Sequence, residues 1–154
     1  MAGALIRVEI DDAELKAKLA RLQSRLGNVS PVLRTIGESL LNSTKDRFKS
    51  QTSPDGAKWK AHAPATVRAR LKGQGNAPLT ILRLRGRLVG SINYQVAGNQ
   101  LKVGTNIVYG AIHQFGGKAG RGRKVTIPAR PYLGISPADR EDILATLDEW
   151  LAAE

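Results

Sequence analysis

The sequence has no cysteine and few aromatic residues, and both absences narrow its chemistry. Without cysteine the chain has no disulfide framework, no thiol nucleophile and no thiolate ligand for a metal. Aromatic residues make up 5% of the 154 residues. Such a low content supplies few of the stacking platforms on which single-stranded nucleic acids bind.

Long hydrophobic runs are also missing. No apolar run approaches the ~18 residues of a membrane-spanning helix. Near the N-terminus the apolar run is limited to Ala4-Leu5-Ile6, before Arg7, which is shorter than the core of a signal peptide. We therefore expect no membrane partner and synthesis in the cytoplasm. The length is typical of one domain, so we predict a single domain over residues 1–154.

Negative charge is absent from the middle of the chain. Residues 56–138 contain fourteen Lys or Arg residues and no Asp or Glu, whereas residues 139–154 contain six acids and one base. The net charge of the whole chain is +11. A run of 83 residues without a carboxylate cannot neutralise its bases internally. It needs another part of the chain, another subunit, an acidic partner, or solvent and salt.

Hydrophobic periodicity predicts three long helices. The first has a leucine stripe from Leu15 to Leu26, Asp11 as N-cap with Glu14 in a capping box, and Gly27 at its end. The second begins at Ser30-Pro31, with the serine as cap. Gly37 lies inside the second helix and predicts close packing against another backbone. The last helix begins at Ser136-Pro137 with Asp139 and has four apolar residues on one side: Ile143, Leu147, Trp150 and Leu151.

Alternating patterns predict strands between these helices. Residues 4–10 and 125–127 alternate, and residues 94–103 alternate around Gly98-Asn99, which is typical of a hairpin with a two-residue turn. Residues 81–88 predict a short helix that continues into a strand, and Asn106 predicts the cap of another short helix. Residues 117–124 predict a flexible basic loop. The fold class is therefore α+β: an antiparallel sheet packed by helices on one side, with N-terminal helices and a C-terminal helix.

No catalytic constellation is present in the sequence. His62 and His113 lack a second ligand at metal spacing, and the chain has no zinc-protease, serine-hydrolase or P-loop motif. The acid pairs near the two ends of the chain occupy positions where they interact favourably with helix dipoles. We therefore expect no catalytic residue, no metal, no cofactor and no small-molecule substrate, and we predict that the protein is not an enzyme.

Nucleic-acid binding is the alternative that the charge favours. An isoelectric point near 10.5 with one wholly basic region is an electrostatic footprint for phosphates. The sequence has no zinc-finger spacing and no aromatic RNA-recognition signature. The alternative is thus a small basic protein with non-specific DNA contact.

Several blocks together resemble the phage virion morphogenesis family, the Mu-like tail-completion proteins of tailed phages and prophages. The most specific pair is His113-Gln114-Phe115-Gly116 and Pro128-Ala129-Arg130-Pro131, about a dozen residues apart. The other matching blocks lie between residues 30 and 136: Ile36-Gly37-Glu38-Ser39-Leu40, Arg47-Phe48, Pro54-Asp55-Gly56 with Trp59, Ile81-Leu82, Val103-Gly104-Thr105-Asn106 and Tyr132-Leu133-Gly134.

The resemblance implies a structural virion protein that acts in tail completion and head-tail joining at the neck, as a ring homo-oligomer. Its implied partners are further copies of itself and neighbouring neck, head-connector or tail-tube proteins, with packaged DNA as a non-specific contact. It implies a location in the tail or neck of the virion after synthesis in the bacterial host cytoplasm, and no catalytic residue to carry over.

Ten residues are predicted to contact a partner: His113, Gln114, Lys118, Arg121, Arg123, Lys124, Arg130, Asp139, Glu141 and Asp142. Arg130 stands between prolines and has two readings, a local hydrogen bond to backbone carbonyls or an intersubunit ion pair. A ring requires two different matching surfaces on one subunit. We therefore hypothesise that residues 139–149 contact the basic region of a neighbouring copy, or fold back on the bases of their own subunit.

Overall fold

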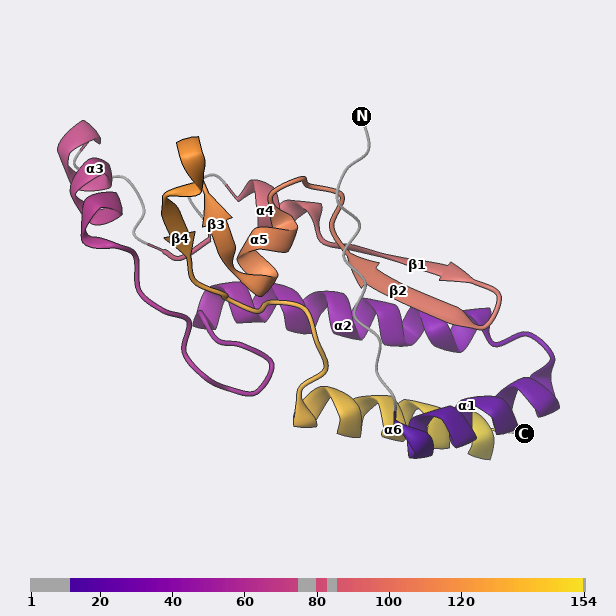
Figure 1. The fold of residues 1–154 in the computed structure, drawn as a ribbon. Coiled ribbons are helices and arrows are strands. Elements are labelled where there is room, and N and C mark those ends of the chain that lie inside the picture. Colours follow the sequence, from indigo (N-terminus) through magenta and orange to yellow (C-terminus); the bar gives the residue numbers. More distant parts are fainter. Residues whose placement is uncertain (1–11, 75–79, 83–85, 154) are drawn as a thin grey trace.

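The computed structural model describes residues 12–74, 80–82 and 86–153. The predicted strand at residues 4–10 therefore lies outside the described residues. The elements follow one another in the order that Figure 1 labels: α1 (Ala13–Leu26), α2 (Ser30–Ser50), α3 (Pro64–Gln74), α4 (Arg87–Ser91), β1 (Asn93–Ala97), β2 (Gln100–Gly104), α5 (Gly110–Phe115), β3 (Gly117–Ala119), the 3-10 turn η1 (Arg121–Arg123), β4 (Val125–Ile127) and α6 (Pro137–Ala152). None of these helices is long and apolar enough to cross a membrane.

Helix α1 forms where the leucine stripe predicts it, but its cap is one residue later than expected. The side chain of Asp12, not Asp11, accepts the backbone N–H groups of Glu14 and Leu15, each at 3.1 Å. Asp12 has an extended backbone, which places its carboxylate over the first turn. Gly27, with φ of 71°, ends the helix as predicted.

Helix α2 starts at Ser30, but the prediction that Ser30 caps it is wrong. Val29 occupies the cap position without a side-chain hydrogen bond, and Asn28 Oδ1 accepts the N–H of Ser30 at 3.1 Å. Gly37 does mark a close approach, although to a side chain instead of a backbone. A Cβ atom on Gly37 would lie 2.6 Å from Cδ2 of the Tyr94 ring.

The predicted hairpin is strands β1 and β2, antiparallel with Tyr94 opposite Val103 and Val96 opposite Leu101. Gly98 takes a positive φ of 59° in the two-residue turn. The half-buried residues of both strands alternate with exposed ones, and α2 packs against the half-buried face (Figure 1). Helices therefore cover one side of this hairpin, as predicted.

The prediction of one sheet is wrong for the described residues, which form two separate two-stranded sheets. The second sheet pairs β3 with β4, with Lys118 opposite Thr126. Strand β4 forms where a strand was predicted at residues 125–127, whereas β3 lies in the segment 117–124 that was predicted as a loop. Two further local predictions also fail: α4 begins at Arg87, whereas residues 81 and 82 form a turn, and Tyr109 instead of Asn106 stands at the cap of α5. The fold is nevertheless α+β.

The apolar residues gather into two clusters, both of which include α2. The first joins α1, α2 and α6: Leu22, Val29, Val32, Leu33, Ile36, Leu40, Ile143 and Leu147. The second is rich in aromatic rings: Phe48, Trp59, Ile81, Leu88, Ile92, Tyr132 and Leu133. The Phe48 ring lies 5.4 Å from the ring centres of both Trp59 and Tyr132. Helix α2 therefore contributes buried residues to both clusters.

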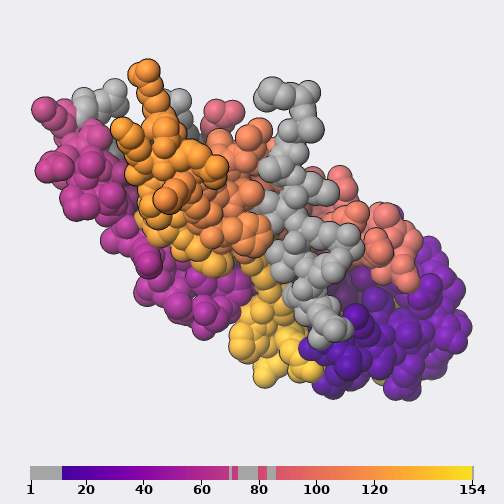
Figure 2. Space-filling view, viewed as in Figure 1, coloured from indigo at the N-terminus to yellow at the C-terminus, as the bar shows by residue number. Residues whose placement is uncertain are grey.

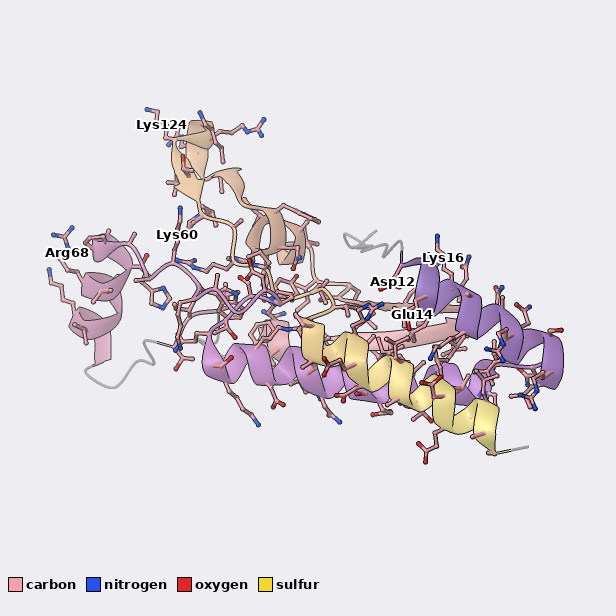
Figure 3. All side chains as sticks on the ribbon, turned by 90° about the horizontal axis from the view of Figure 1, so that it is seen from below. Asp12, Glu14, Lys16, Lys60, Arg68 and Lys124 are labelled. Atoms are coloured by element: carbon pink, nitrogen blue, oxygen red, sulfur yellow. The ribbon has the colours of Figure 1, made fainter. Side chains whose placement is uncertain are left out.

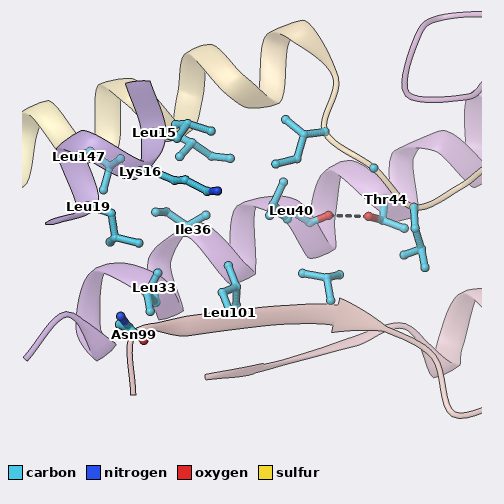
Figure 4. A pocket seen from close by; sticks show the side chains of 15 residues that line it. Leu15, Lys16, Leu19, Leu33, Ile36, Leu40, Thr44, Asn99, Leu101 and Leu147 are labelled. Atoms are coloured by element: carbon cyan, nitrogen blue, oxygen red, sulfur yellow. Dashed lines mark hydrogen bonds between the residues drawn. The ribbon is translucent and has the colours of Figure 1, made fainter. Parts of the chain in front are cut away.

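A cavity of about 260 Å³ lies in the first cluster, between α1, α2, α6 and β2. Figure 4 shows that its labelled lining is mostly leucine and isoleucine, with Lys16 and Asn99 as polar residues. Its one marked hydrogen bond, from Thr44 Oγ1 to the carbonyl of Leu40 at 2.7 Å, is internal to α2. The cavity is an apolar gap between helices, without a set of convergent polar groups for catalysis.

The molecule is elongated, and its elements are divided between two ends. Helix α3 and the β3–η1–β4 hairpin lie at one end, whereas α1 and most of α6 lie toward the other (Figure 1). Figure 2 shows the tip of the hairpin, in orange, projecting from the surface. Charged groups that belong to these elements are therefore held far apart within one subunit.

Candidate interaction surface

The basic segment 117–124 forms β3 and the turn η1 instead of a loop. The turn is tight because three residues have a left-handed backbone conformation: Gly120, Gly122 and Arg123, with φ values of 79°, 70° and 54°. The side chains predicted to contact a partner here are all exposed: Lys118, Arg121, Arg123 and Lys124. In the described part of the chain, none of these four forms an ion pair. Their positive charge faces outward.

Gln114 is buried within the subunit, and its contact with a partner stays a prediction. Its side chain is 7% exposed. Its Oε1 accepts the N–H groups of Tyr132 and Leu133, each at 3.0 Å, and its Nε2 donates to the carbonyl of Leu133 at 3.0 Å. One amide thus satisfies three backbone groups of the segment that leads to α6.

The two most specific sequence blocks lie against each other. The N–H of Arg130 donates to the carbonyl of His113 at 2.7 Å. Gly116, with φ of 73°, ends α5 at this contact, and a Cβ atom there would lie 2.8 Å from the backbone nitrogen of Ala129. Only glycine fits both the positive φ and the space. The pairing of these blocks therefore has a structural cause, the docking of residues 128–133 on α5.

Arg130 forms the hydrogen bonds to backbone carbonyls of its local reading. Its guanidinium donates from Nε to the carbonyl of Lys60 at 2.8 Å and from a terminal nitrogen to the carbonyl of Ala61 at 2.9 Å. The residue is 7% exposed. These donors are used within the subunit, and the contact of Arg130 with a partner stays a prediction. Arg130 anchors the segment before α3.

A groove of about 590 Å³ lies between this anchored segment, α4, α5 and β4. Among its exposed lining residues, Lys60 and Arg87 supply positive charge, and Tyr109 and Val125 supply apolar surface. Buried Leu88 and Arg130 also line it. None of the lining residues that the structure describes is acidic. The groove is therefore suited to a partner that carries carboxylates and some apolar surface.

His113, a predicted contact residue, lines this groove and is half-buried. Its Nδ1 is buried and has no hydrogen-bond partner among the described residues. The ring of Tyr109 meets it edge to face, with centres 5.9 Å apart. Burial, and then the charge of Arg130, lower the pKa of His113 below its usual value. The imidazole is therefore neutral at pH 7 and contributes shape instead of charge.

Exposed apolar side chains beside the groove are the feature that the sequence analysis missed. Tyr109 and Phe115, at the two ends of the short helix, are 41% and 64% exposed. Val108 and Val125 are also more than half exposed. Of these four residues, Tyr109 and Val125 line the groove, and contiguous exposed apolar surface is typical of interaction sites. Their spacing is the same as that of a buried face, so the sequence alone offered no signal of exposure.

The acidic helix α6 begins with the predicted capping box. Ser136 Oγ accepts the N–H of Asp139, and Asp139 Oδ2 accepts the N–H of Ser136, each at 3.0 Å. Asp139 also accepts a hydrogen bond of 2.6 Å from Ser43 Oγ and forms an ion pair with Arg47. It is 6% exposed. The carboxylate of Asp139 is therefore used inside the subunit, and its contact with a partner stays a prediction.

Other charges join α6 to α1 in the same subunit. Lys18 pairs with Asp148, and Arg140 pairs with Asp12 and with Glu14, the latter at 2.7 Å. The hydrogen bond from Arg140 lowers the pKa of Asp12. Some acids of α6 thus fold back on their own subunit, but onto bases of α1 and α2 and not onto residues 56–138. The predicted contact residues Glu141 and Asp142 remain exposed.

The charged groups of the described residues are unevenly distributed. Figure 3 shows the cations Lys60, Arg68 and Lys124 at one end, whereas Lys16 lies with Asp12 and Glu14 toward the other. Among the residues whose placement is described, no three His, Asp or Glu side chains come together as a metal site. The two candidate surfaces are therefore a basic, partly apolar groove and an acidic helix face.

The comparison with known proteins decides the family. The model of the phage virion morphogenesis family matches residues 10–152. The chain belongs to this family. Membership identifies it as a phage structural or assembly protein associated with the virion.

The relatives match along nearly the whole chain. "Mu-like prophage FluMu G protein 2" of Haemophilus influenzae is 37% identical over 147 residues, which are 95% of this chain and 96% of that protein. "Putative capsid assembly protein G" of Escherichia phage Mu is 29% identical over 150 residues, 92% of this chain and 96% of that protein. "Mu-like prophage FluMu G protein 1" of H. influenzae is 22% identical over 147 residues. No solved structure shows a significant match.

Proposed function

We propose that this protein completes the tail of a tailed phage or prophage and joins tail to head at the neck, as a ring of identical subunits. The observation that carries the proposal is the separation of two surfaces of opposite charge on one elongated subunit. The basic, partly apolar groove lies among α4, α5 and β4, and α6, which carries the exposed carboxylates of Glu141, Asp142 and Glu149, extends toward the other end of the molecule (Figure 1). Membership of the virion morphogenesis family supports the structural part of this proposal.

A ring follows from this arrangement by symmetry. Two different surfaces that match each other make a head-to-tail contact, and such contacts generate a closed ring when the rotation between copies closes. Charge complementarity favours the correct register and speeds association. The exposed bases of β3 and η1, with no carboxylate near them in sequence, then contact neighbouring neck, head-connector or tail-tube proteins.

Protein contact suits these bases better than DNA contact. The genome must slide through the neck, and fixed cations on phosphates would slow it. We therefore assign Lys118, Arg121, Arg123 and Lys124 to neighbouring proteins, with non-specific DNA contact as the alternative. The name of the phage Mu relative supplies a second candidate function, capsid assembly.

Deletion of the gene from the phage or prophage that carries it separates these functions. Loss of tail completion leaves DNA-filled heads and unjoined tails in lysates viewed by electron microscopy, and the gene supplied in trans restores joined particles. Absent or aberrant heads beside normal tails would favour capsid assembly instead. Normal, infectious particles would contradict both roles.

A further inference from the structure

We infer that the groove between α4, α5, β4 and residues 60–66 receives the exposed face of α6 from a second copy of this chain. This inference deepens the proposed function, because it names the two surfaces through which copies of the subunit meet. It does not depend on whether the assembled protein sits at the neck.

The groove carries the features of an unfilled protein-binding site. Tyr109 and Val125 expose 41% and 57% of their surface and line it together with the cations Lys60 and Arg87. Lys60 and Arg87 are both exposed. A site lined by both apolar surface and cations favours a partner with small apolar groups and carboxylates. Without a partner, this apolar surface stays in contact with water, which is unfavourable.

Helix α6 presents a face of this chemistry. Its exposed residues recur at helical spacing and alternate small apolar groups with carboxylates: Ala138, Glu141, Asp142, Ala145 and Glu149. The alanines allow close approach of the helix, and the carboxylates flank them. Unlike Asp139 and Asp148, the acids in this stripe form no ion pair within the described residues.

The groove of a subunit does not receive its own α6. That helix packs on α1 and α2 through Ile143 and Leu147, on the side opposite its exposed stripe. The groove instead lies among α4, α5 and β4, toward the other end of the molecule (Figure 1). Contact between the two surfaces therefore requires a second copy, and each added copy leaves one groove and one helix face available for the next.

Charge reversal tests the contact. Native mass spectrometry and sedimentation at low salt are expected to show wild-type oligomers that dissociate as salt is raised. The variant E141K/D142K is expected to be monomeric. Asp142→Lys alone is expected to raise the Kd about tenfold or more, whereas its matched control, Asp46→Lys on the exposed face of α2, leaves the Kd unchanged. Circular dichroism confirms that each variant is folded.

Complementation makes the test specific. The groove variant K60E/R87E is also expected to be monomeric, but a 1:1 mixture with E141K/D142K restores oligomers in which the two variants alternate. Mixtures that stay monomeric, or E141K/D142K that assembles like wild type, would overturn the inference. A wild-type protein that stays monomeric at all concentrations would also overturn it, whereas the deletion phenotype would still decide the proposed function.

Discussion

Arg47 on α2 and Asp139 in the first turn of α6 form a buried ion pair across 92 residues of sequence. Arg47 also donates to the carbonyl of Tyr132 at 2.9 Å and to Ser43 Oγ at 3.1 Å. Burial lowers the pKa of Arg47, while the charge of Asp139 opposes that shift. The pair therefore links the helical cluster, the aromatic cluster and the start of α6 at one point.

Removal of one partner leaves the other as an uncompensated buried charge. We expect Asp139→Ala to lower the free energy of unfolding by about 3–5 kcal/mol, the usual effect of breaking a buried pair. Asp142→Ala, one turn further along α6 and exposed, should change it by less than about 0.5 kcal/mol. Urea denaturation of both variants measures the difference. Equal effects would show that the pair is not buried as described.

Gly37 is predicted to resist substitution despite its place inside a helix. Alanine improves helix propensity by about 1 kcal/mol, but its Cβ would overlap the Tyr94 ring, and overpacking costs about 1–3 kcal/mol. We therefore expect Gly37→Ala to destabilise the fold. Gly90→Ala, where a Cβ meets nothing within 4 Å, is the control and should be neutral or stabilising. Thermal unfolding distinguishes them, and a stabilised Gly37→Ala would contradict the contact.

Substitutions at the adjacent residues 114 and 115 are predicted to have very different effects on the free energy of unfolding. Gln114→Leu leaves three buried backbone groups without their partner, and each such group costs about 1–3 kcal/mol. Phe115→Ser changes an exposed side chain and should alter stability by about 0.5 kcal/mol or less. Denaturant titration of the two variants measures this. A larger loss for Phe115→Ser than for Gln114→Leu would contradict the internal role of the Gln114 amide.

Acid is predicted to weaken the fold partly through His113. Because burial lowers its pKa in the folded state, the unfolded chain binds the proton more readily, and stability falls as the pH drops below the ordinary value of about 6.5. His113→Gln removes this contribution, so its unfolding free energy should change less between about pH 7.5 and pH 5.5 than that of wild type. Lys118→Gln, which removes an exposed charge, is the control. If the unfolding free energy of His113→Gln changed with pH as steeply as that of wild type, the prediction would be contradicted.

Some helix ends could be predicted from the local sequence, although the caps expected at Ser30 and Asn106 were wrong. The box of Ser136 with Asp139 and the stop at Gly27 depend on groups within a few residues, so the local sequence contains the whole cause. The cap at Asp12 was missed by one residue because two adjacent aspartates offer the same chemistry. Pairing between strands depends on distant residues, and so one sheet was predicted where two hairpins form.

The candidate site was predictable only where exposure follows from charge. Lys118, Arg121, Arg123 and Lys124 are exposed, and their contact with a partner stays a prediction. Arg130 and Asp139 carry charges too, but backbone carbonyls and Arg47 satisfy them inside the subunit. Their partners lie tens of residues away in sequence, where no local pattern indicates them.

The most direct test of the central claim is the position of this protein in purified virions, determined by electron cryomicroscopy. The account predicts a closed ring of identical subunits between head and tail, with α6 of each copy seated in the groove of the next. Particles that lack the protein, or that hold it as isolated subunits within the head shell, would contradict it.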